Sequence, residues 1–96
     1  MNRKKALDIL TRLKPELANR FGVTGLALFG STVRNEATED SDIDIVVSFD
    51  APATSKKYFG VQFLLEDELG QSIDLVTEKA LRPELKTFIE NEAINV

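Results

Sequence analysis

Segments of helical length alternate with short apolar runs along the 96 residues of this chain, and this alternation limits the possible folds more than any other feature. Three runs have the length of buried strands: GLALFG (25–30), DIDIVVSF (42–49) and SIDLVT (72–77). The remaining segments favour helices because their apolar residues recur at helical spacing or lie between residues that start and stop helices. The expected helices cover residues 2–22, with a kink or a new helix at Pro15, then 31–35, 55–69 with Ser55 as the cap, and the stretch from Pro83 onward.

This order predicts an α/β fold in which about four helices flank a small, mixed, three-stranded sheet. The strand at 72–77 follows a helical crossover, so we expect it to run parallel to one neighbour. No linker or repeat interrupts the chain, and its length suits one hydrophobic core. We therefore expect one domain over residues 1–96.

The composition excludes several kinds of chemistry. The chain has no histidine and no cysteine, which excludes imidazole bases, thiolate nucleophiles and ordinary zinc sites. Any metal must then be held by oxygen ligands, as Mg²⁺, Mn²⁺ and Ca²⁺ are. The net charge is −4 and there is no basic stripe, so we expect no direct binding of polynucleotides, although an acidic body could dock on a basic protein.

The sequence gives no sign of a membrane or secreted protein. Its apolar runs are too short to cross a bilayer, and its basic N-terminus turns amphipathic rather than uniformly apolar. Together with the lack of cysteine, this favours a cytoplasmic protein.

Acidic residues are placed on two of the expected strands. Asp42 and Asp44 are two apart, so both side chains leave the same face, with backbones roughly 6–7 Å apart. In the third strand, Ile73 and Leu75 point to one face and Asp74 points to the other. If the two strands are neighbours, three carboxylates lie on one patch.

Three like charges at such range are costly unless something compensates them. One or two divalent cations are the simplest compensation, because Mg²⁺ binds one or two carboxylates together with substrate phosphates. The alternative is a solvated acidic turn that leads into a strand. A calcium loop counted from Asp40 fails, since its sixth position is Ile45 rather than glycine and its twelfth is Ala51 rather than glutamate.

A glycine–serine turn precedes the acidic segment. A strand that ends at Gly30 and opens a helix at Ser31 exposes free backbone N–H groups, which form an anion site. Arg34 lies one turn along and is able to reach a phosphate. The turn is neither a Walker loop nor a dinucleotide-binding fingerprint, and a plain strand–helix junction with a capping serine is the alternative.

The combined pattern resembles the DNA polymerase beta-like nucleotidyltransferase superfamily. Within it the chain is similar to the minimal nucleotidyltransferases (MNT), the antitoxins of prokaryotic HEPN/MNT toxin–antitoxin modules. Where many relatives have a small residue and then Arg-Gly, this chain has Val33-Arg34-Asn35, and asparagine can replace glycine in a left-handed turn. The resemblance extends over nearly the whole chain and is carried by Gly30, Ser31, Arg34, Ser41, Asp42, Asp44 and Asp74.

The resemblance implies the nucleotidyltransferase fold and a role for each of these residues. Gly30 and Ser31 would bind the triphosphate of ATP, with Arg34 and Ser41 also at the nucleotide. The three aspartates would hold Mg²⁺, or Mn²⁺, and Asp74 would also help to deprotonate the attacking hydroxyl. The implied reaction transfers AMP from ATP to a tyrosine of a partner HEPN ribonuclease toxin, which silences the toxin.

Two other functions remain open at this stage. The chain could neutralise a toxin by binding alone, through its last helix or the Phe59–Phe63 region, although we expect those phenylalanines to pack in the core. It could also be a nucleotidyltransferase for a small molecule. The apolar C-terminal end, residues 93–96, is a further candidate surface for a homodimer.

Overall fold

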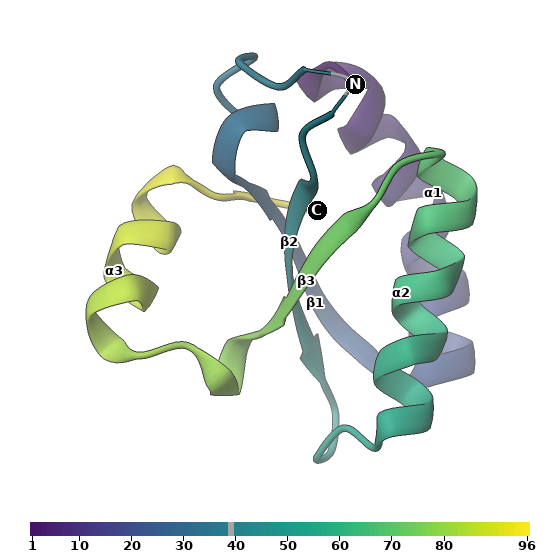
Figure 1. Ribbon diagram of the computed structural model, residues 1–96. Helices are drawn as coiled ribbons and strands as arrows, with labels where there is room; N and C mark the ends of the chain where they lie inside the picture. Colours follow the sequence, from purple (N-terminus) through teal and green to yellow (C-terminus); the bar gives the residue numbers. More distant parts are fainter. Residues whose placement is uncertain (39) are drawn as a thin grey trace.

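The computed structural model describes residues 1–38 and 40–96, in which four strands form one mixed sheet in the order β3-β2-β1-β4. Helices α1 and α2 cover one face of this sheet and α3 lies on the other (Figure 1). The elements are α1 (Arg3–Phe21), β1 (Val23–Phe29), η1 (Gly30–Thr32), β2 (Ile43–Phe49), α2 (Ser55–Leu69), β3 (Ile73–Thr77), η2 (Glu78–Ala80), α3 (Pro83–Glu92) and β4 (Ile94–Asn95), where η marks a 3₁₀ turn.

The α/β class and the mixed sheet are as expected, but the expected numbers of strands and helices are wrong. The described residues form four strands and three α-helices, and the expected helix at 31–35 is reduced to the short turn η1. Asn35 does adopt the left-handed conformation, with φ 57°. The fourth strand forms because Ile94 and Asn95 pair antiparallel with β1, opposite Leu28 and Ala27. The parallel pairing of β3 with β2 confirms the expected crossover.

Helix α1 is continuous through Pro15, so no new helix begins there. Pro15 lies inside it, and Leu13 and Leu17 are buried on either side. Packing of this apolar face outweighs the roughly 3 kcal/mol that an internal proline costs. The helix begins at Asn2, whose side chain accepts a hydrogen bond from the Lys5 N–H, and ends at Gly22 as expected.

Helix α2 corrects two further expectations. Its cap is Thr54 rather than Ser55, because the Thr54 hydroxyl accepts a hydrogen bond from the Lys57 N–H at 3.2 Å. The expected core residues Phe59 and Phe63 are 49% and 64% exposed. The helix buries its opposite stripe, made up of Val61, Leu65 and Leu69, and a residue two positions away along a helix points to the other side.

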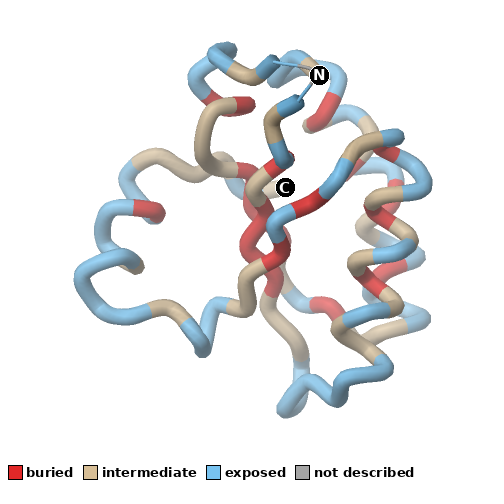
Figure 2. The backbone as a smooth tube through the Cα atoms, in the orientation of Figure 1, coloured by how far each residue is buried: buried red, intermediate tan, exposed pale blue. Residues whose placement is uncertain are grey.

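The core is unequal on the two faces of the sheet. The larger part lies between the sheet and helices α1 and α2, and Figure 2 shows the buried stretches concentrated there and in the central strands. On the α3 face, the buried residues are Ala27, Val46 and Ile89. Leu85 and Phe88 of α3 are exposed. No helix in the described part of the chain is long and apolar enough to cross a membrane.

Candidate functional site

The acidic residues of β2 and β3 lie side by side on the sheet. Asp44 and Asp74 are register partners in the parallel pair, which confirms that the two strands are neighbours. Ile43 and Ile45 on either side of Asp44 are fully buried in the main core. Because strand side chains alternate, the carboxylates point to the opposite face of the sheet, the side on which α3 lies.

The environment of Asp44 disfavours its charged form. Partial burial, the negative charge of Asp74, a side-chain hydrogen bond with Asp74 and the charge of Asp42 together raise the pKa of Asp44 to about 6. The positive charge of Arg34 lowers the pKa of Asp44, but it does not cancel the increase from the other groups. The site therefore holds more negative charge than its own cation neutralises.

This charge fits a divalent cation held by oxygen ligands. Asp42 is exposed just before β2, so it can approach a bound ion together with Asp44 and Asp74. Within residues 1–38 and 40–96, however, no three acidic side chains form a ready-made metal cluster. The carboxylates of Asp42, Asp44 and Asp74 lie in one region of the protein, but they are not grouped as the ligands of a metal site. A bound metal would have to bring the three side chains closer to one another.

The glycine–serine turn lies directly against these acids. Gly30 follows β1, whose last residue Phe29 pairs with Asp44 on β2. It has φ 75°, and a Cβ atom at this position would overlap the carboxylate of Asp44. Only glycine fits this conformation next to Asp44 without strain. The two parts of the motif, 14 positions apart in the chain (44 − 30), are therefore in contact.

Arg34 lies beside this turn and is held by two acids. Its Nε donates to Glu36 at 3.0 Å, and its Nη1 donates to Glu92 at 2.7 Å. These partners, the hydrogen bond to Glu36 first, raise the pKa of the guanidinium above its ordinary value. Ser31 lies half-buried within η1, and the neighbouring Thr32 hydroxyl is buried with no hydrogen-bond partner among the described residues.

Ser41 takes part in the loop that leads into β2. Its hydroxyl accepts a hydrogen bond from the Thr38 N–H at 3.1 Å, and its carbonyl accepts one from the Gln71 side chain at 3.1 Å. These contacts tie the loop to the segment before β3, near Asp42. Its role at a nucleotide remains a prediction.

Glu92, at the end of α3, is a member of the site that the sequence analysis missed. Its Oε1 accepts hydrogen bonds from the Gly30 N–H at 2.6 Å and from Arg34, and its side chain is only 17% exposed. No local signal in the sequence marks this glutamate, because it is 62 positions from Gly30 and reaches the turn only when α3 folds back over the sheet.

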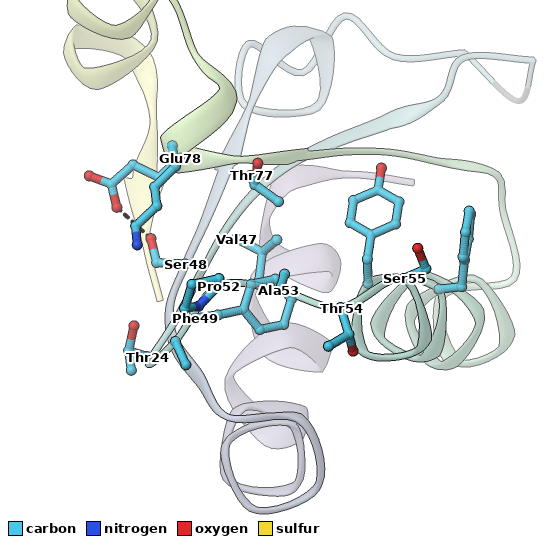
Figure 3. Close-up of a pocket in the computed structure, with 14 residues that line it drawn as sticks. Thr24, Val47, Ser48, Phe49, Pro52, Ala53, Thr54, Ser55, Thr77 and Glu78 are labelled. Carbon is cyan, nitrogen blue, oxygen red and sulfur yellow. Dashed lines mark hydrogen bonds between the residues drawn. The ribbon is translucent and has the colours of Figure 1, made fainter.

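A cavity of about 650 Å³ lies at the opposite end of the strands (Figure 3). Its walls include Ser48, Thr77 and Glu78, and the Ser48 hydroxyl donates to the Glu78 carboxylate. None of the seven predicted site residues, all of them in the described part of the chain, lines it. We place the candidate site at the aspartates, because charge and backbone geometry converge there.

Comparisons with known proteins identify the family of the chain. The family model described as nucleotidyltransferase domain matches residues 10–96. The protein adenylyltransferase MntA of Thermococcus cleftensis is 41% identical over 89 residues, which cover 93% of this chain and 90% of that protein. A relative from Methanocaldococcus jannaschii is 42% identical over 90 residues, which cover 93% of this chain and 92% of that relative.

Solved structures show the same fold. A structure assigned as a minimal nucleotidyltransferase superposes with a TM-score of 0.84 at 33% identity, covering 100% of this chain and 97% of the other. A toxin–antitoxin complex with AMP-PNP gives a TM-score of 0.71 at 21% identity, covering 99% of this chain and 72% of that one. The chain described here therefore belongs to the nucleotidyltransferase domain family, as a minimal nucleotidyltransferase homologous to MntA.

Proposed function

We propose that this protein is an Mg²⁺-dependent antitoxin that transfers AMP from ATP to a hydroxyl, expected to be a tyrosine, of a partner HEPN ribonuclease toxin. The observation that carries the proposal is the contact of Gly30 with Asp44, itself paired with Asp74. A turn able to bind phosphate next to paired carboxylates suits phosphoryl transfer, which relies on positioning and charge stabilisation. The 41% identity to the adenylyltransferase MntA supports the same reaction.

In this proposal the turn holds the nucleotide and the aspartates hold the metal. The backbone at Gly30 and the hydroxyl of Ser31 bind the triphosphate, and Arg34 and Ser41 also contact the nucleotide. Bound Mg²⁺ supplies charge neutralisation at the phosphates. The residues that would hold it are Asp42, Asp44 and Asp74.

Asp74 is the proposed base. It is exposed on β3, so an incoming hydroxyl from a partner can reach it. The oxygen of that hydroxyl forms a bond to the α-phosphorus, the bond to pyrophosphate breaks, and the proton passes to Asp74. AMP then remains on the acceptor and pyrophosphate leaves.

The partner is proposed from two kinds of support. Structures of similar fold include a complex of a tri-AMPylated HEPN toxin of Shewanella oneidensis with an MNT antitoxin, at 20% identity and a TM-score of 0.66. The net charge of −4 also suits docking on a basic protein surface.

A second candidate function is neutralisation by binding alone. Phe59 and Phe63 stack on the exposed side of α2, with ring centroids 6.2 Å apart. Exposed aromatic pairs are frequent anchors of protein interfaces. This surface would serve a sequestering antitoxin as well as a docking enzyme.

Loss of the metal-binding acids separates the two candidates. The measurement is cleavage of RNA by a purified HEPN toxin after incubation with the antitoxin, ATP and Mg²⁺. Asp42→Asn combined with Asp44→Asn should leave the toxin active if transfer of AMP is the mechanism. Full neutralisation by this double variant, or by the wild type without ATP, would favour sequestration. Asp67→Asn, an exposed change on α2, is the matched control.

A further inference from the structure

One carboxylate oxygen already occupies the proposed phosphate site. The Oε1 atom of Glu92 accepts the Gly30 N–H at 2.6 Å and the Nη1 of Arg34 at 2.7 Å. The proposed function assigns the Gly30 backbone to the triphosphate, and Arg34 is the nearby cation that can reach a phosphate. Carboxylate and phosphate oxygens are both anionic acceptors, and each forms strong hydrogen bonds with such donors.

The two ligands exclude one another. Glu92 and a phosphate oxygen cannot both take the full donor set of Gly30 and Arg34, and their like charges repel at that distance. Glu92 also places a further negative charge directly beside Gly30. The ion pair of Glu92 with Arg34 offsets part of the cost of that charge, but only while no other anion binds at Gly30 and Arg34.

We propose that Glu92 is an internal phosphate surrogate, which must leave Gly30 and Arg34 before a nucleotide triphosphate binds. The proposal rests on the assignment of this site to a nucleotide. Glu92 thereby sets the affinity of the site, because a nucleotide binds only the fraction of molecules in which the glutamate has swung away.

Helix α3 is suited to carry such a movable group. Within α3, all of which the structure describes, Ile89 is the residue that is buried. A cavity of about 500 Å³ lies between α3 and the sheet, lined in part by Ala27, Val46 and Ile89. Figure 2 shows most of the helix exposed. A helix with so little packing can shift at a low cost in free energy.

Glu92→Gln tests the proposal, because it keeps a neutral acceptor of the same shape and removes the charge. Binding of Mg²⁺–AMP-PNP and of Mg²⁺–tripolyphosphate is measured by calorimetry. We expect both to bind about tenfold more tightly than to the wild type, since a charge-assisted pair is replaced by a weaker neutral one. Glu90→Gln is the matched control: it removes the same charge from an exposed position on the same helix and should change little.

Unchanged or weaker binding to Glu92→Gln would overturn the proposal, since the glutamate would then be neutral or would position Arg34 for the nucleotide. The absence of binding to every variant, wild type included, would overturn the proposed function as well. Tight binding that is equal in the wild type and Glu92→Gln would overturn only the role of Glu92.

A measurement on the unaltered chain avoids any effect of the substitution on folding. The amide of Gly30 and the carboxyl carbon of Glu92 are followed by NMR while Mg²⁺–tripolyphosphate is added. We expect both signals to shift together with the same midpoint, as the glutamate is released and phosphate replaces it at the amide. A Glu92 signal that stays constant while Gly30 shifts would overturn the proposal.

Discussion

Asp44 and Asp74 are register partners on adjacent parallel strands, and the charge of Asp74 helps to raise the pKa of Asp44 to about 6. The pair thus holds unfavourable electrostatic energy in the folded protein. Enzymes often accept such a cost where charge is needed for function.

The first prediction concerns the pH dependence of stability. The pKa of Asp44 is raised from an ordinary 3.8, so the folded state favours the protonated form. Asp44 therefore contributes fully to the free energy of unfolding below about pH 4, and this contribution is lost as the pH rises through about 6. Asp44→Asn should therefore increase the melting temperature at pH 7.5 in EDTA, with a gain that shrinks toward pH 4.

Asp67→Asn, at an exposed position on α2, is the control for this experiment and should show no such pH-dependent gain. A melting temperature for Asp44→Asn that is lower than that of the wild type at pH 7.5, or a gain that is independent of pH, would contradict the electrostatic account of the pair.

The second prediction concerns Gly30. Gly30→Ala forces a side chain into the left-handed region and against the carboxylate of Asp44. We expect a loss of about 2–4 kcal/mol in the free energy of unfolding, from backbone strain and steric overlap together. Gly70→Ala is a matched control, because Gly70 has φ 70° but nothing within 4 Å of an added Cβ. Its cost should be about 1 kcal/mol.

Urea denaturation of both glycine variants measures the difference. Equal losses would mean that the contact between Gly30 and Asp44 adds nothing to the strain of the turn.

The third prediction concerns the exposed aromatic pair on α2. Phe63→Ala should change the free energy of unfolding by less than about 1 kcal/mol, because the ring is exposed and loses mainly its stacking on Phe59. Leu65→Ala, two positions along the helix, should cost about 2–5 kcal/mol because Leu65 is fully buried. Thermal or urea unfolding gives both values, and a large loss for Phe63→Ala would place the ring in the core after all.

Local patterns predicted much of the fold. The alternation of isoleucine and aspartate placed Asp44 and Asp74 on the outer face of two strands, and the parallel pairing followed from the helix between them. The expected ends of the helices at 2–22 and 55–69 also agree with the structure, in which Gly22 and Gly70 follow these helices in the left-handed conformation.

The parts that sequence reasoning missed depend on contacts that form only in the folded chain. Strand β4 is two residues long and exists because β1 offers it a partner edge. Pro15 stays inside a helix because burial of its neighbours outweighs a local preference. Glu92 reaches Gly30 from the far end of the chain, and no spacing rule connects positions so distant.

The site is therefore only partly visible in the sequence. The resemblance to the minimal nucleotidyltransferases linked the aspartates to the glycine turn, and the structure brings Gly30 and Asp44 into contact. The charge balance of that contact, with Arg34 held by Glu92 rather than free for a phosphate, appears only in three dimensions.

The transfer of label from ATP to a HEPN toxin tests the central claim most directly. The toxin is incubated with this protein, Mg²⁺ and ATP labelled at the α-phosphate, and in parallel with ATP labelled at the γ-phosphate. The account predicts that the α-label alone appears on the toxin, and that Asp44→Asn or EDTA abolishes it. An unlabelled toxin, transfer of the γ-label, or labelling that persists with Asp44→Asn would contradict it.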